Sequence, residues 1–118
     1  MAADQAQSVT KIFLSQQAFE LICRSNYQLS MHEQKQRQLQ QVIAHMLETL
    51  ESFAESTLTD MRAMSPLGGD TTIFVRLDVD EAIKLKTLRT KALDEHKMDL
   101  SLREAVIALC LALIEKFA

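Results

Sequence analysis

The chain has 118 residues, of which 47% are hydrophobic and 25% charged, and its formal net charge is −3. This composition suits one compact domain or two very small ones and excludes a disordered chain. Only two glycines and one proline are present, which leaves few turns. Tryptophan is absent and aromatic residues are few, so the core must be built mainly from aliphatic residues. Both features favour a helical fold.

The charges are unevenly distributed between the two halves. Residues 1–70 contain 5 Lys and Arg against 8 Asp and Glu, whereas residues 71–118 contain 8 of each. Neither half is a basic arm, so a contact with nucleic acid would come from a few locally placed cations. No apolar run approaches the ~20 residues of a membrane span, and residues 1–7 show no signal peptide. We therefore expect a cytoplasmic protein.

Few residues point to a metal site or to catalysis. His45 and Glu48 share a helix face, but no further ligand completes a site. The chain lacks a Ser-His-Asp pattern, a nucleophile elbow and a glycine-rich phosphate loop. We expect no metal, no cofactor and no enzymatic activity. Cys23 and Cys110 lack CxxC spacing, which favours two reduced, buried thiols, and a disulfide between them stays open as the alternative.

The first half contains a weak strand pattern and two helical patterns. Residues 9–15 are β-prone, and a helix is expected over residues 16–26. Ser30-Met-His-Glu33 matches a capping box, which predicts the start of a second helix. No helix breaker follows before about Met64, so this helix should exceed 30 residues. Its apolar residues form one stripe: Leu39, Val42, Ile43, Met46, Leu47, Leu50 and Phe53.

The second half opens with the clearest strand, Asp70 to Asp78, after a linker at residues 66–69. Its side chains alternate, so Ile73, Val75 and Leu77 share one face. A helix is expected over residues 79–92, then a charged connection over residues 93–99. Ser101-Leu-Arg-Glu104 is a second capping box before an almost wholly apolar helix, residues 102–117. Such a helix must be buried on all sides, and we expect a second subunit to help cover it.

The two halves resemble each other when they are aligned. The strand and first helix align at an offset of 63 residues, with Leu14 on Leu77. The two capping boxes align instead at an offset of 71, which requires a connection eight residues longer in the second half.

The second half resembles the ribbon-helix-helix family of DNA-binding proteins, the MetJ/Arc type. The resemblance rests on residues 72–78, on Ala82, Leu85 and Leu88, and on residues 100–107. It implies that the strand pairs antiparallel with the same strand of a second chain, and that this ribbon enters the DNA major groove. The alternative pairing is with residues 9–15 of the same chain.

The resemblance also implies a set of DNA-binding residues. The outward strand residues Thr72, Phe74 and Arg76 would read bases, with Arg76 able to bond guanine O6 and N7 together. Phe74 departs from the polar residue usual there. The amides that open the last helix would hold a backbone phosphate. The residues expected at that contact are Leu100, Ser101 and Leu102, with Lys97 nearby.

The sequence therefore predicts a mainly α protein in two parts. Residues 1–65 would form a helical half for oligomerisation or partner contacts, with a degenerate second strand-helix-helix copy as an open alternative. Residues 71–118 would form the ribbon-helix-helix domain. We expect a homodimer or higher oligomer that binds double-stranded DNA. It would act as a transcriptional regulator, such as a repressor, or as an accessory factor. The DNA would be that of the nucleoid, a plasmid or a phage. The alternative is an adaptor or inhibitor that only dimerises through this fold and presents residues 31–64 to a protein partner.

Overall fold

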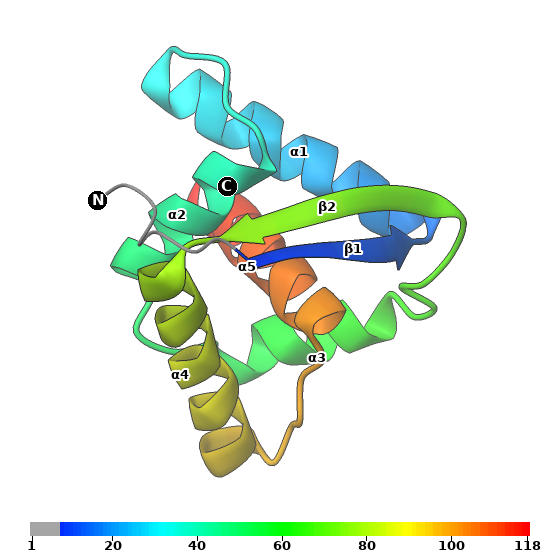
Figure 1. Ribbon diagram of the computed structural model, residues 1–118, viewed down its shortest axis with the longest axis vertical. Helices are drawn as coiled ribbons and strands as arrows, with labels where there is room; N and C mark the ends of the chain where they lie inside the picture. Colours follow the sequence, from blue (N-terminus) through cyan, green and yellow to red (C-terminus); the bar gives the residue numbers. More distant parts are fainter. Residues whose placement is uncertain (1–7) are drawn as a thin grey trace.

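The computed structural model describes residues 8–118, which form five helices and one two-stranded sheet (Figure 1). In this view both strands lie in front of the apolar helix α5 (Leu102–Lys116), with α1 (Gln16–Glu33) toward the top and α4 (Val79–His96) toward the bottom (Figure 1). In chain order the elements are β1 (Ser8–Leu14), α1 (Gln16–Glu33), α2 (Leu39–Thr49), α3 (Glu55–Ala63), β2 (Thr71–Leu77), α4 (Val79–His96) and α5 (Leu102–Lys116).

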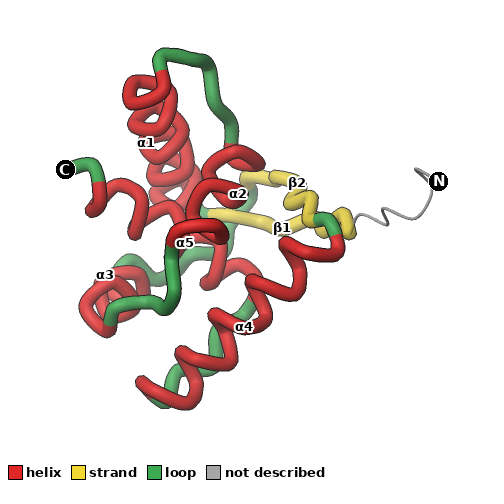
Figure 2. Tube along the Cα trace, turned by 90° about the vertical axis from the view of Figure 1, so that its left-hand side faces the viewer, coloured by secondary structure: helices red, strands yellow, loops and turns green. Residues whose placement is uncertain are grey.

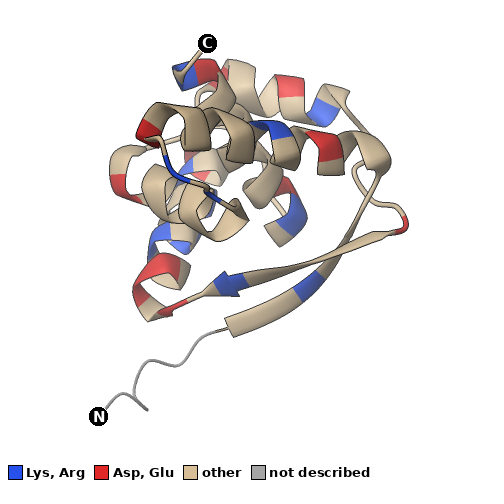
Figure 3. Ribbon diagram, turned by 90° about the horizontal axis from the view of Figure 1, so that it is seen from above, with Lys and Arg blue, Asp and Glu red and all other residues tan. Residues whose placement is uncertain are grey.

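The two strands pair with each other within one chain. β1 and β2 are antiparallel, with Ser8 opposite Leu77 and Leu14 opposite Thr71. The alternation predicted for β2 is confirmed: Val75 and Leu77 are buried, while Phe74 and Arg76 are exposed. The helices lie on one side of this ribbon, so its other face looks away from the body of the protein (Figure 3).

This pairing corrects the expected architecture. Residues 71–118 are not a ribbon-helix-helix unit whose strand waits for a second chain, because β2 lies in the middle of the chain and pairs with the N-terminal strand β1. The backbone donors and acceptors of β2 on that side are thereby satisfied within the chain, so ribbon formation requires no second subunit.

A loop and one glycine hold the two strands in register at one end. The Ser15 amide donates to the Leu67 carbonyl at 2.6 Å, which ties the loop before β2 to the end of β1. A Cβ at Gly69 would lie 2.7 Å from the Leu14 carbonyl oxygen and from the Ser15 Cα. Only glycine allows this close approach of two backbones.

The expected long helix over residues 31–64 is wrong. Ser30 lies inside α1, where its Oγ donates to the Asn26 carbonyl, and α1 ends only at a left-handed C-cap, Gln34. α2 ends at Thr49, its C-cap Leu50 has an extended backbone, and α3 begins at Glu55. The bend buries Phe53 to 2% exposure, and His96 Nε2 lies 3.0 Å from its carbonyl oxygen. Burial of the Phe53 ring stabilises the bend more than the hydrogen bonds of a continued helix would stabilise a straight segment.

The last helix is covered by its own chain. α5 packs against α1, α2 and α3, and most of its residues from Ala105 to Ile114 are buried (Figure 2). Burial of this helix therefore does not require a second subunit, contrary to the sequence-based expectation. Within residues 8–118, no helix combines the length and the apolar character needed to cross a membrane.

The second half follows its predicted elements more closely. The capping box before α5 is confirmed, since Ser101 Oγ accepts from the Glu104 amide and Glu104 Oε1 accepts from the Ser101 amide. α4 extends beyond the expected end at Ala92 to His96 and closes with a left-handed C-cap at Lys97. The connection is therefore shorter than the expected residues 93–99.

The elements repeat along the chain at one constant offset. Adding 63 to the bounds of β1 and α1 gives the bounds of β2 and α4, and the first residue of α2, Leu39, maps onto Leu102 of α5. The helix caps obey the same offset, from Ser15 to Asp78 and from Gln34 to Lys97. The offset of 71 that the two apparent capping boxes suggest is thus wrong, because the partner of Ser101 is Gln38.

Candidate nucleic-acid interface

The outer face of the ribbon carries six alternate side chains from the two strands. In opposite pairs these are Val9 and Arg76, Lys11 and Phe74, and Phe13 and Thr72. All six are exposed, and the apolar members are among the most exposed hydrophobic residues described: Val9 50%, Phe13 45% and Phe74 57%. A two-stranded sheet normally turns such residues inward, so this face has the composition of a binding surface.

The charge on this face is wholly positive. Lys11 Nζ lies 5.6 Å from the centroid of the Phe13 ring, within the range of a cation–π contact. No acidic side chain lies on the face, and among residues 8–118 neither Lys11 nor Arg76 forms an ion pair. Both cations are therefore available to an anionic partner.

The start of α2 borders this face. A hollow of about 150 Å³ lies between Gln38 and Gln40 on one side and Phe74 and Arg76 on the other. Long polar side chains thus frame the β2 edge of the ribbon, where they are able to contact a ligand that reaches Arg76.

The expected phosphate contact is arranged less favourably. Leu100 is buried, and its carbonyl accepts a hydrogen bond of 2.9 Å from Arg89 Nε. The amides of Ser101 and Glu104 are already engaged in the capping box. Glu104 also places a carboxylate at this helix start, where a phosphate would have to bind. The positive dipole end of α5 is thus partly neutralised by its own chain.

Two further predicted residues lie apart from the outer face of the ribbon. Lys97 caps the end of α4, is exposed, and its Nζ lies 3.3 Å from the Asp94 carbonyl oxygen. Leu102 is half-buried in a groove behind the ribbon, together with Thr10 and Leu77. Of the predicted set, the structure brings together Thr72, Phe74 and Arg76, while Lys97, Leu100, Ser101 and Leu102 lie at the α4–α5 connection.

Lys11 and Phe13 belong to this face but were not predicted as binding residues from the sequence. Three consecutive apolar residues, Ile12 to Leu14, obscure the alternation of β1. Applied to the whole strand, the offset of 63 places Val9 on Thr72 and Lys11 on Phe74, so the internal repeat was the signal that identifies the second half of this face.

The histidines do not assemble a metal site. His45 lies 3.9 Å from Glu33 and 3.4 Å from Lys116, not in a pair with Glu48. The His32 ring stacks on Phe117 at a centroid distance of 4.3 Å. Among residues 8–118, no group of three potential metal ligands is close enough to hold an ion.

The two cysteines differ in their surroundings. Both are free, and Cys110 is fully buried, as predicted, whereas Cys23 is exposed on α1 and that prediction is wrong. Burial raises the pKa of Cys110 to about 12, so this thiol is inert.

Comparison with known proteins identifies no relative: no family model, curated protein or solved structure matches the chain.

Proposed function

We propose that this chain is a non-enzymatic DNA-binding protein that inserts its intramolecular ribbon into the major groove. The observation that supports the proposal is the outer face of the ribbon, which combines two unpaired cations with exposed apolar side chains and no acid. A two-stranded ribbon fits the major groove, which is about 12 Å wide. Within this role the chain would act as a transcriptional regulator, such as a repressor, or as an accessory factor on plasmid, phage or nucleoid DNA.

Each residue of this face has a role that follows from its chemistry. Arg76 would donate two hydrogen bonds to guanine, and Lys11 would contact a guanine edge or a phosphate. Thr72 would bond a base, while Phe13 and Phe74 would contact thymine methyl groups. The resemblance of the strand residues to the ribbon-helix-helix family stays a prediction, as does binding as a homodimer or higher oligomer.

The alternative function, a protein-interaction adaptor, would use residues 31–64. Most apolar residues of this segment pack into the core of the same chain, with Val42, Met46 and Met61 each at most 2% exposed, whereas Met31 is exposed. Most of the predicted apolar stripe is therefore engaged within the chain. The ribbon face is the better supported contact.

Selection from a random duplex library at low salt, followed by fluorescence anisotropy on the selected sequence, tests the proposal. Arg76→Ala should weaken binding by about 5- to 150-fold, since a bidentate base contact is worth about 1–3 kcal/mol. Arg24→Ala removes an exposed cation that belongs to α1 and not to the ribbon; it is the control and should bind like wild type. The affinity should also fall steeply as salt increases.

Two results would refute the proposal. One is a wild-type protein that binds no duplex at low salt. The other is an Arg76→Ala variant with wild-type affinity for the selected sequence.

A further inference from the structure

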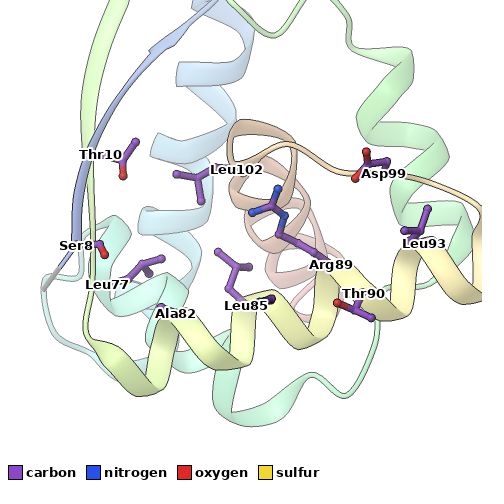
Figure 4. Close-up of a pocket in the computed structure, with 11 residues that line it drawn as sticks. Ser8, Thr10, Leu77, Ala82, Leu85, Arg89, Thr90, Leu93, Asp99 and Leu102 are labelled. Atoms are coloured by element: carbon purple, nitrogen blue, oxygen red, sulfur yellow. The ribbon is translucent and has the colours of Figure 1, made fainter. Parts of the chain in front are cut away.

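A groove of about 480 Å³ separates the inner face of the ribbon from α4 (Figure 4). Ser8 and Thr10 border it from β1, and Leu77 and Leu85 line its floor. Thr10 belongs to the inner face of β1, yet it is exposed, because no helix covers this end of the ribbon. The size of the groove is in the range of small-molecule sites, roughly 300–1,000 Å³.

The internal repeat shows how α4 differs from its counterpart α1 beside the groove. At the offset of 63, Ala82 of α4 corresponds to Phe19 of α1, whose ring packs against the core. Thr90 corresponds to Tyr27, whose side chain is exposed. The second copy thus lacks the Phe19 ring of the first copy. Its smaller counterpart, Ala82, lines the groove.

The groove also differs from its counterpart in charge. Lys86 and Arg89 replace Cys23 and Asn26 of the first copy, and they lie one turn apart on the groove side of α4. Arg89 Nε donates to the Leu100 carbonyl at 2.9 Å, which fixes the guanidinium where it points into the groove (Figure 4). Among residues 8–118, no carboxylate forms an ion pair with either cation.

One carboxylate, Asp99, also borders the groove. It lies on the side of Arg89 that faces away from the ribbon (Figure 4). The end of the groove nearest the ribbon is therefore positive above an apolar floor. This arrangement is complementary to a molecule with one anionic end and one apolar end.

We propose that this groove binds a small organic carboxylate with an apolar body. Arg89 and Lys86 bind the carboxylate. It balances two positive charges with which no carboxylate of residues 8–118 forms an ion pair. The apolar body lies on Leu77, Leu85 and Leu102 and displaces water from them. The Thr10 hydroxyl lies at the ribbon wall and is able to donate to a carboxylate oxygen.

Titration of the ¹⁵N-labelled full chain, followed by ¹H–¹⁵N correlation spectra, tests this proposal. The probes are decanoate, used below its micelle concentration, and 2-naphthoate, which distinguish an aliphatic from an aromatic body. Binding of either carboxylate should shift the amides of Thr10, Leu85 and Arg89. Decanol, which has the same chain as decanoate without the charge, should bind about tenfold more weakly.

Matched variants connect the binding to the groove. Lys86→Met should weaken the better probe about five- to tenfold. Lys84→Met removes the same charge from α4 outside the groove and should change the affinity less than about twofold. Ala82→Phe restores the ring of the first copy and should abolish binding. If Ala82→Phe fails to fold, the pair of lysine variants decides.

The proposal is overturned if neither carboxylate shifts the groove amides at millimolar concentration. It is also overturned if decanol binds as tightly as decanoate, or if Lys86→Met and Lys84→Met bind alike. None of these measurements involves DNA, so they are independent of the ribbon's proposed role.

Discussion

His45 lies where α1, α2 and the end of α5 meet. Burial is the main cause that lowers the pKa of His45 below its ordinary value of 6.5, and Lys116 at 3.4 Å lowers it further. Glu33 at 3.9 Å acts in the opposite direction. Of the more distant groups, His32 lowers this pKa and Glu48 raises it. The net result favours the neutral imidazole in the folded state.

The lowered pKa of His45 predicts that the protein loses stability in mild acid. The unfolded state takes up a proton near pH 6.5, whereas the folded state resists protonation until a lower pH. The contribution of His45 is therefore fully present above pH 6.5 and is lost as the pH falls through the folded pKa. Urea unfolding between about pH 7 and about pH 5.5, where most carboxylates stay ionised, measures this loss. His45→Gln should show a smaller decrease than wild type, and equal decreases would contradict the prediction.

At the scale of elements, the junction between β2 and α4 depends on one cap. Asp78 Oδ1 accepts from the Glu81 amide at 2.8 Å, and Glu81 Oε1 accepts from the Asp78 amide at 3.0 Å. These bonds satisfy donors at the start of α4 and end the strand at the same residue. The cap therefore positions both the Arg76 end of the ribbon and the groove side of α4.

We expect Asp78→Ala to lower the free energy of unfolding by about 1 kcal/mol, within a range of roughly 0.5–2 kcal/mol for N-cap removal. Chemical denaturation followed by circular dichroism measures the change. Asp80→Ala removes the same charge from the first turn of α4 without removing a cap, and it should cost less, about 0.3 kcal/mol. If the two variants lose equal stability, only the charge matters and the role of the cap is refuted.

The sequence predicted those elements whose local signals agree with their packing. Asp70 to Asp78 has clean alternation after two glycines, and Ser101 to Glu104 is a capping box followed by an apolar helix. Both predictions hold because burial and local preference favour the same structure. Ser30 to Glu33 also matches a capping box, but Leu29 is buried there in the middle of α1, and the helix continues through it.

The local sequence does not predict the bend after α2. Residues 50–54 contain no proline or glycine, and nothing in their sequence interrupts a helix. The bend is stabilised from a distance: Lys91 of α4 donates to the Glu51 carbonyl at 2.9 Å, and His96 contacts the Phe53 carbonyl. These partners lie about forty residues away in the chain. The outer face of the ribbon also depends on residues far apart in the chain. Half of its side chains come from β1, and they form one surface with those of β2 only when the two strands pair.

At the scale of the whole molecule, one hydrophobic core joins residues from both halves. Leu14 of β1 and Val75 of β2 belong to the same buried cluster, as do Val42 of α2 and Leu109 of α5. The covering of α5 comes from α1, α2 and α3, all of which precede residue 65. The division into residues 1–65 and 71–118 thus follows the repeat in sequence, while the buried surface crosses it.

This shared core predicts that residues 71–118 do not fold alone. Without residues 1–70, β2 has no strand partner, and the apolar sides of α5 that meet α1, α2 and α3 are open to water. A lone strand and an uncovered apolar helix do not offset the entropy of ordering the chain. Circular dichroism of this segment should show little helix and no cooperative unfolding in urea, in contrast to the full chain.

Mixing residues 71–118 with a separate segment of residues 1–70 should restore helix content and cooperative unfolding, because the missing strand and helices are then supplied in trans. A segment 71–118 that unfolds cooperatively by itself would show that its core is complete without the first half, and the intramolecular ribbon would then be dispensable for folding.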